Sequence, residues 1–159
     1  MNRMNRRNFL LCLTLALSQV AACSNQEDAR KSIQSRYDQF NLAWAGKDRK
    51  KVEDIFAPDC KFKQTDEGRA LTLPQFMQGI EFSFRAMTVV SVKTQIDTLK
   101  LDKDSAEVTA STTSEVRIAK PEMDGNQSQP QLNKSTQIVR DTWKKTTDGW
   151  RIILRVIEG

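Results

Sequence analysis

The sequence contains no histidine among its 159 residues, and it has only three cysteines and one tyrosine. Histidine is the commonest general base near neutral pH and the commonest metal ligand, so the chain lacks both of these devices. No cysteine or carboxylate cluster has the spacing of a metal site either. We therefore expect no metal and no other cofactor, and we assign no residue a catalytic role.

A strongly basic character is also missing once the N-terminus is set aside. The whole chain carries a net charge of +5, but three arginines precede residue 23, whereas every acidic residue follows it. A chain that began at Cys23 would keep 22 basic and 20 acidic residues, a net charge of +2. Domains that bind nucleic acid usually carry a concentrated basic face, so we expect no nucleic-acid partner.

Residues 1–22 have the three parts of an export signal peptide: basic MNRMNRR, apolar FLLCLTLAL, and small residues before Cys23. The apolar run is too short for a permanent transmembrane helix. The stretch from Val20 to Cys23 resembles a bacterial lipobox, which implies cleavage before Cys23 and a diacylglycerol attached to its thiol. The alternative is an ordinary signal peptide that happens to contain a cysteine.

The lipobox also implies a location. An acylated Cys23 would hold the protein in the lipid bilayer of a bacterial envelope, followed by a tether over residues 23–31. Ser24 after the cysteine favours the outer membrane, facing the periplasm, by analogy with Gram-negative sorting. The pair Arg6-Arg7 resembles a twin-arginine export signal, so that route and general secretion both stay open.

Cysteine usage excludes an intrachain disulfide in the exported form. Cys12 would leave with the signal peptide and Cys23 would be acylated, so Cys60 would have no partner. Cys60 opens a strand pattern, and we expect a small buried apolar residue there rather than a reactive thiol.

Residues 32–159 are expected to form one domain, beginning with two helices. Steps of four, three and four place four apolar residues on one face of the first helix: Ile33, Tyr37, Phe40 and Trp44. Gly46 suits a left-handed stop, and Asp48 is the expected N-cap of a short second helix. Ala57 to Asp59 would form the turn that ends it, because Pro58 cannot continue a helix.

A strand and a third helix follow. The strand starts at Cys60 and would turn Phe62 and Gln64 inward. Thr72 and Gln75 form a capping-box pattern at the start of the third helix. Its expected inward stripe consists of Phe76, Ile80 and Phe84.

From Thr88 the hydrophobic period changes to two, which predicts strands over 88–101, 106–118, 136–145 and 150–157. Leu99 and Leu101 lie out of phase with the earlier residues of their strand, so a bulge or burial on both faces is expected. Residues 120–134 form a polar loop, and 147–149 form a tight hairpin turn.

Three short motifs accompany this order of elements: Phe40 with Trp44, the FAPD sequence that begins at Phe56, and the closing Trp150-Arg151-Ile152. The order of elements, together with these motifs, resembles the nuclear transport factor 2-like superfamily. Its SnoaL-like branch is the most similar, and the resemblance covers about residues 28–158. It implies an α+β fold in which three N-terminal helices pack in a strongly curved antiparallel sheet, a cone-shaped α+β barrel. An apolar pocket inside the cone and dimerisation through the outer sheet face recur on this fold.

Ketosteroid isomerase, an enzyme branch of the superfamily, needs a carboxylate base and a phenol that binds an oxyanion. An ungapped comparison anchored on Asp48 and Phe56-Ala57 puts the base position on Gln64 and the phenol position on Phe40. An amide does not abstract a proton and a phenylalanine donates none. The scytalone dehydratase branch relies on histidine, which is absent.

The resemblance leaves two functions open. The first is a non-catalytic, membrane-anchored domain that binds a small apolar ligand or a protein partner. The expected pocket lining is Tyr37, Phe40, Trp44, Phe62, Gln64, Phe76, Ile80 and Phe84. The second is an enzyme of the SnoaL-like cyclase or ketosteroid isomerase type, with Tyr37, Asp141 or Gln64 in a rearranged site. A homodimer through the Thr- and Ser-rich strand faces near residues 109–113 is a further expectation.

Overall fold

The computed structural model describes residues 6–65, 68–118 and 131–158, with side chains from residue 25 onward. The helices are α1 (Arg6–Ala45), α2 (Arg49–Glu53) and α3 (Leu73–Ala86). The strands are β1 (Phe56–Lys63), β2 (Leu71–Thr72), β3 (Met87–Asp102), β4 (Ser105–Ile118), β5 (Gln131–Thr146) and β6 (Gly149–Glu158). The predicted signal peptide, the thiol of Cys23 and most of the predicted loop lie outside the described side chains.

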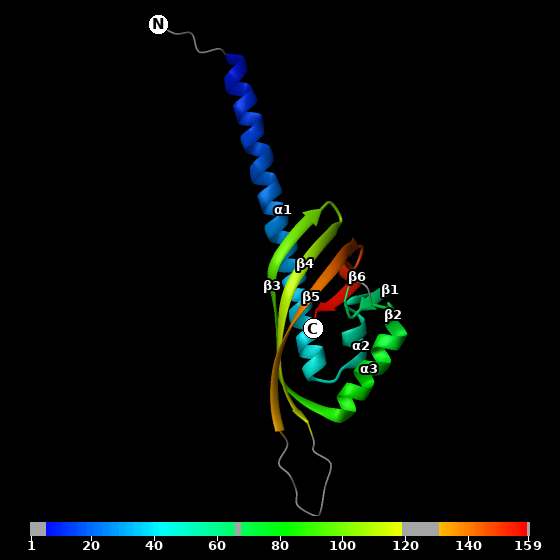
Figure 1. Cartoon of the computed structure of the whole chain (residues 1–159). Coiled ribbons are helices and arrows are strands. Elements are labelled where there is room, and N and C mark those ends of the chain that lie inside the picture. The colour runs from blue at the N-terminus through cyan, green and yellow to red at the C-terminus, as the bar shows by residue number, and fades with distance from the viewer. Residues whose placement is uncertain (1–5, 66–67, 119–130, 159) are drawn as a thin grey trace, which may run out of the picture.

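The strands form one curved six-stranded sheet in the order β2-β1-β6-β5-β4-β3, and the helices lie in its hollow (Figure 1). The predicted α+β cone is therefore confirmed. The sheet differs from the expectation in two respects: it is open, and β1 pairs with β6 in parallel. A parallel pair needs a long crossover, and α3 with the three long strands between β1 and β6 provides it. No described helix is long and apolar enough to cross a membrane.

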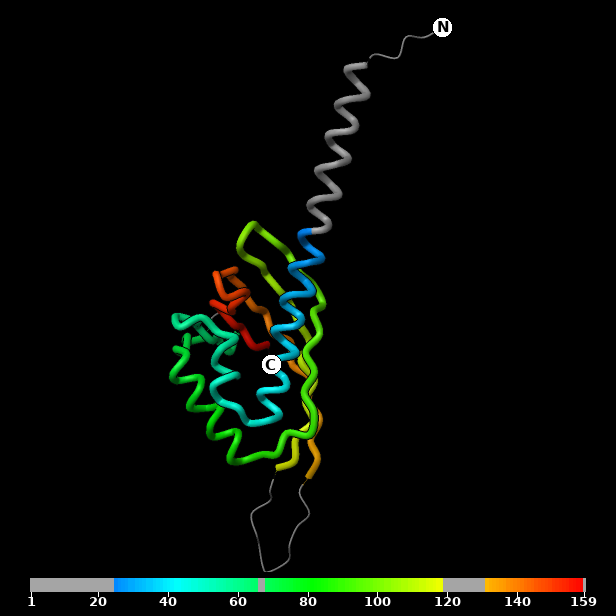
Figure 2. Tube along the Cα trace, turned by 180° about the vertical axis from the view of Figure 1, so that it is seen from behind, coloured from blue at the N-terminus to red at the C-terminus, as the bar shows by residue number. Residues whose placement is uncertain are grey.

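From residue 25 onward, α1 lies along β3, which forms one edge of the sheet (Figure 2). Side chains of α1 donate hydrogen bonds to strand carbonyls: Gln26 to Leu99 O at 3.1 Å and Gln34 to Thr94 O at 2.8 Å. An edge strand leaves backbone groups unpaired, and these side chains cover them. The range 23–31, for which the sequence predicts a tether, is thus helical and held against the sheet from Gln26 onward.

The end of α1 differs from the prediction by one residue. Gly46 N still donates to Leu42 O at 2.9 Å, so the left-handed residue is Lys47, with φ of 56°. The side chain of Lys47 also holds this turn against α3, because its Nζ donates a hydrogen bond to Phe84 O at 2.5 Å. Asp48 caps α2 as expected, because its carboxylate accepts a hydrogen bond from Lys51 N.

The turn expected at Ala57 to Asp59 is wrong, because these residues lie within β1. The pairing of β1 with β6 shifts between Phe56 and Lys61, so Pro58 falls where the ladder is interrupted. A residue without a backbone N–H suits that position. The expected bulge in β3 is confirmed by a shift between Ile96 and Thr98, which returns Leu99 to the buried face.

The strand and helix ends show two further differences. β5 begins at Gln131, so the last residues of the loop expected at 120–134 belong to a strand. On α3, Met77 is fully buried, whereas Phe76 and Phe84 of the expected stripe are half-buried. The capping box at Thr72 is confirmed.

Candidate functional site

A cavity of about 490 Å³ lies between α3, the end of α1 and the hollow face of the sheet. The helices contribute Phe40, Trp44, Gln75, Phe76, Gly79, Ile80 and Ser83, and β2, just before α3, contributes Leu71. The sheet side contributes Met87, Val92, Thr94, Thr112, Ser114, Val116, Ser135, Gln137, Val139, Arg155 and Ile157. Its size and mainly apolar lining are typical of small-molecule sites.

The structure brings four of the eight predicted lining residues to this cavity: Phe40, Trp44, Phe76 and Ile80. The other four lie elsewhere. Phe62 stacks on Phe76 at a centroid distance of 3.9 Å, and Phe84 packs edge-on against Trp44 at 5.5 Å. Both therefore contact residues that line the cavity without lining it themselves. Gln64 is exposed, because β1 ends at Lys63 and the strand alternation stops there.

Tyr37, the fourth, is fully buried in a polar network. Its Oη donates to Asp141 Oδ2 at 2.6 Å and accepts from Trp143 Nε1 at 3.3 Å. Arg155 donates two hydrogen bonds to the same carboxylate, from Nε to Oδ1 at 2.8 Å and from Nη2 to Oδ2 at 2.6 Å. Both Asp141 oxygens are therefore occupied, which satisfies a carboxylate that is only 2% exposed.

The electrostatics of this network keep Tyr37 neutral and Arg155 charged. Burial, and then the negative charge of Asp141, raise the pKa of Tyr37 well above its usual range, so the phenol stays a neutral donor. Burial by itself would lower the pKa of Arg155, but attraction to Asp141 and their hydrogen bonds outweigh it and raise that pKa. Asp141 and Arg155 thus form a buried, mutually neutralised ion pair.

Arg155 is the member of the network that reaches the cavity. Its guanidinium carbon lies 5.4 Å from the ring centre of Phe40 and 5.3 Å from that of Phe56, within cation–π range. Among the described residues, it supplies the one ionisable side chain in the cavity lining. Sequence reasoning missed it: Arg140 stands next to Asp141 in the chain, but Arg140 bonds Glu158 instead.

The one available signal for Arg155 was a charge in the middle of an apolar strand. The pairing of β5 with β6 shifts between Thr142 and Trp143, and this irregularity sets which β6 residues face inward. Such a bulge has no clear mark in the sequence, so strand alternation alone could not place the Arg155 side chain.

The sheet wall of the cavity carries a polar stripe built from paired strand positions. Thr94 Oγ1 donates to Asn41 Oδ1 at 3.0 Å and lies 3.1 Å from Thr112 Oγ1. In the next row, Ser114 Oγ and Ser135 Oγ are 3.0 Å apart. The stripe is uncharged, and α3 lies across the cavity from it with Phe76 and Ile80 and the neutral Gln75 and Ser83.

The family model of the SnoaL-like domain matches residues 26–156. The chain belongs to the SnoaL-like domain family. No curated protein matches it in sequence.

Solved structures with the same fold share little sequence with this SnoaL-like domain. A conserved protein from Planctomyces limnophilus is 11% identical with a TM-score of 0.65, covering 80% of this chain and 92% of its own. A ketosteroid isomerase-like protein from Erwinia carotovora atroseptica is 11% identical with a TM-score of 0.61, covering 81% and 94%. A nuclear transport factor 2-like superfamily protein from Salmonella enterica serovar Typhimurium is 14% identical with a TM-score of 0.62, covering 84% and 92%. The family match bears out the SnoaL-like resemblance. The structural likenesses confirm the predicted fold, and they carry no function by themselves.

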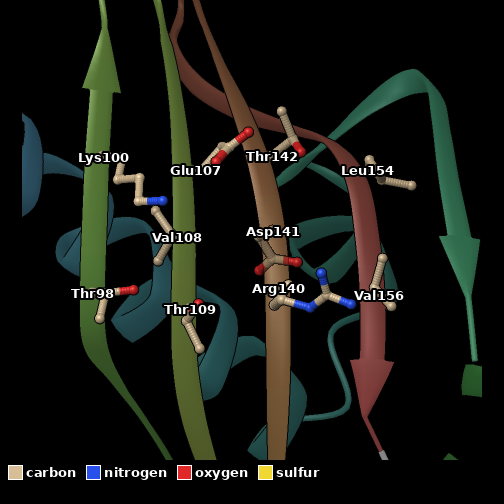
Figure 3. Close-up of a pocket in the computed structure, with 10 residues that line it drawn as sticks. All are labelled: Thr98, Lys100, Glu107, Val108, Thr109, Arg140, Asp141, Thr142, Leu154 and Val156. Carbon is tan, nitrogen blue, oxygen red and sulfur yellow. The ribbon is translucent and has the colours of Figure 1, made fainter. Parts of the chain in front are cut away.

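A second, smaller crevice of about 320 Å³ lies on the sheet face turned away from α1 (Figure 3). It is lined by Thr98, Lys100, Glu107, Val108, Thr109, Arg140, Asp141, Thr142, Leu154 and Val156. Figure 3 shows Lys100 and Thr98 on β3 beside Glu107 and Thr109 on β4. This is the face for which the sequence predicts a homodimer, and that expectation stays a prediction.

Metal chemistry finds no support in the described part of the SnoaL-like domain. No group of three or more Cys, Asp or Glu side chains there is placed to hold a metal ion. The buried thiol of Cys60 has a pKa raised to about 12, mainly by burial, so it stays protonated near neutral pH.

Proposed function

We propose that this chain is a lipid-anchored envelope protein whose SnoaL-like domain binds a small, mainly apolar molecule in the cone without converting it. One observation carries the proposal. Within the described residues, the cavity of about 490 Å³ has Arg155 as its one ionisable lining group, and Asp141 already neutralises that group. Such a lining can hold a ligand but offers little for proton transfer.

General acid–base catalysis needs a titratable group within hydrogen-bond reach of the substrate. Asp141 has both oxygens engaged, and Tyr37 uses its proton in a bond to Asp141. Neither side chain lines the cavity, and Gln64 is exposed. The alternative is an enzyme of the cyclase or isomerase type that uses Tyr37, Asp141 or Gln64. Such an enzyme would need the hydrogen bonds among Tyr37, Asp141 and Arg155 to break. The observed hydrogen bonds therefore support ligand binding rather than catalysis.

The anchor follows from the lipobox and suits the geometry of the domain. Gln26, three residues after Cys23, contacts Leu99, close to the turn that joins β3 to β4. The cavity uses the opposite part of the same strand, from Met87 to Thr94. An acylated Cys23 would therefore hold the β3–β4 turn nearest the bilayer and leave the cavity away from it, in the periplasm.

Native mass spectrometry of the full chain purified from its host cells tests the binding. We expect the protein to carry a small molecule that is released on denaturation. A protein that carries none, and that also binds no apolar fluorescent probe, would contradict the proposal.

Gly79 offers a clean way to assign that molecule to the cavity. It lines the cavity from the middle of α3, and a Cβ added there would meet nothing within 4 Å. Gly79→Leu should fill cavity space and stabilise the helix by about 0.5–1 kcal/mol. We expect bound ligand to fall several-fold, whereas Gln78→Leu, at the exposed neighbouring position, should change nothing. Equal occupancy in both variants would exclude the cavity as the site.

A further inference from the structure

We propose that the cavity selects an uncharged amphipathic ligand, which presents a carbonyl or hydroxyl oxygen to the guanidinium of Arg155. This inference rests on the proposed binding function and adds the chemical class of the ligand. Three observations carry it: the free edge of Arg155, the charge balance around it and the neutral polar stripe on the sheet wall.

The guanidinium of Arg155 is only partly used by the protein. Nε and Nη2 donate to the two oxygens of Asp141, and Nη1 has no hydrogen-bond partner among the described residues. Arginine presents five N–H donors in a rigid plane, so the edge that carries Nη1 remains available. Since Arg155 lines the cavity and Asp141 does not, that edge is the one a ligand can reach.

The donor is also held in position before any ligand arrives. The rings of Phe40 and Phe56 lie beside the guanidinium, and Tyr37 and Trp143 fix the carboxylate to which it is bound. Arg155 is only 6% exposed. A hydrogen bond to such a donor orders no further protein side chain, so less binding energy is lost to conformational entropy.

Charge balance decides which acceptor fits. Asp141 already cancels the charge of Arg155 inside a buried site. A ligand carboxylate would add a second anion near Asp141 and would leave one negative charge buried without a counterion, which is costly. A carbonyl, ester or hydroxyl oxygen accepts from Nη1 and leaves the charges balanced. The site therefore favours a neutral acceptor.

The remainder of the lining matches the same kind of molecule. The sheet wall offers neutral hydroxyl and amide groups, and α3 supplies Phe76 and Ile80 opposite, together with the uncharged Gln75 and Ser83. The groups on the sheet wall belong to Thr112, Ser114, Ser135 and Gln137. A ligand with an apolar body and neutral oxygens along one side would satisfy both walls. Among the described lining residues no second charge is present to pair with an ionised group.

Three matched probes test the inference: pyrenebutyric acid methyl ester, pyrenebutyrate and pyrene. The full chain is held in an amphipathic polymer, and energy transfer from its tryptophans, including Trp44 in the cavity wall, reports binding. Near neutral pH we expect the ester to bind at least about tenfold more tightly than the carboxylate, and more tightly than pyrene. Gly79→Leu supplies the background from partition into the polymer.

Each result that differs from these expectations overturns a particular part of the inference. Carboxylate binding as tight as ester binding overturns the charge argument, and pyrene binding as tight as ester binding overturns the role of the Arg155 donor. In both cases the proposed cavity function stands. If none of the probes binds above the Gly79→Leu background, the ligand class is wrong. A co-purified molecule that depends on the cavity would still keep the binding function.

A double variant separates recognition from folding. Asp141→Leu with Arg155→Met replaces the ion pair by apolar side chains and leaves no buried charge unpaired. We expect it to bind pyrene and to lose the preference of the ester over pyrene. Arg140→Gln, at a neighbouring arginine that does not line this cavity, should keep the preference. A double variant that keeps it would overturn the inference.

Discussion

Tyr37 Oη lies 2.6 Å from Asp141 Oδ2, although 104 positions separate the two residues in the chain. The bond joins the C-terminal part of α1 to β5, and Arg155 joins the same carboxylate to β6. One buried carboxylate thus ties the helix layer to two strands of the sheet, directly beside the cavity.

The first prediction concerns the loss of the negative charge of Asp141. Asp141→Asn leaves the guanidinium of Arg155 buried without a counterion and should lower the free energy of unfolding by about 3–5 kcal/mol. Urea denaturation followed by circular dichroism measures the change. The double variant Asp141→Leu with Arg155→Met should lose much less, because no charge remains unpaired. If the double variant is as unstable as the single one, the ion pair is not the cause.

The second prediction isolates the phenol. Tyr37→Phe keeps the ring, which packs edge-on against Trp143 at 5.1 Å, and removes only the hydroxyl that donates to Asp141. Hydrogen bonds to charged groups contribute about 1.5–3 kcal/mol, so we expect a loss in that range by urea denaturation. The tryptophan also loses its acceptor, which adds to the effect. An unchanged urea midpoint would mean that the bond contributes nothing.

The third prediction is a loss of stability at alkaline pH. Burial raises the pKa of Cys60 from 9.0 to about 12, so the unfolded chain releases this proton first. Its stabilisation is therefore complete below pH 9 and falls above it, by up to about 1.4 kcal/mol per pH unit. The raised pKa of Tyr37 acts in the same direction above pH 10.

Cys60→Ala separates the two groups. Between pH 9 and pH 10 its urea midpoint should fall less steeply than that of the unsubstituted protein, since the ordinary pKa of the thiol, 9.0, lies below that of the phenol, 10.0, and the unfolded chain therefore releases the thiol proton first. Parallel profiles for the two proteins would show that the thiol does not contribute.

The fourth prediction concerns the anchor. Cys23→Ala should abolish incorporation of a fatty-acid analogue and release the protein from the membrane fraction, because the thiol that would carry the diacylglycerol is gone. Cys60→Ala is the matched control, since that thiol is buried and should not affect labelling. Label that persists in the Cys23 variant would exclude the lipoprotein assignment.

Much of the fold could be predicted because its signals are local. Helical spacing placed Ile33 and Phe40 in the core, and alternation indicated the long strands and the bulge near Leu99. The order of these elements carried the family resemblance. Errors arose where a long-range pairing overrides a local pattern: Pro58 lies in a strand that shifts its register, and Gln64 lies just beyond the end of that strand.

The candidate site was only half accessible from the chain alone. Phe40 and Trp44 could be placed in it because one helical face must be buried. Asp141 could be noticed as a candidate, but its partner could not be identified, since Arg140 is adjacent in sequence and Arg155 is adjacent in space.

The sequence by itself determined the class of fold, the absence of histidine chemistry and the expectation of an anchored domain, because composition and periodicity are properties of the chain. Only the tertiary structure decided what the cavity contains. A bulge between β5 and β6 accompanies the inward placement of Arg155 beside Asp141, and pairing across strands assembles the hydroxyl stripe. Those relationships depend on register, which is settled only when the whole sheet closes around its helices.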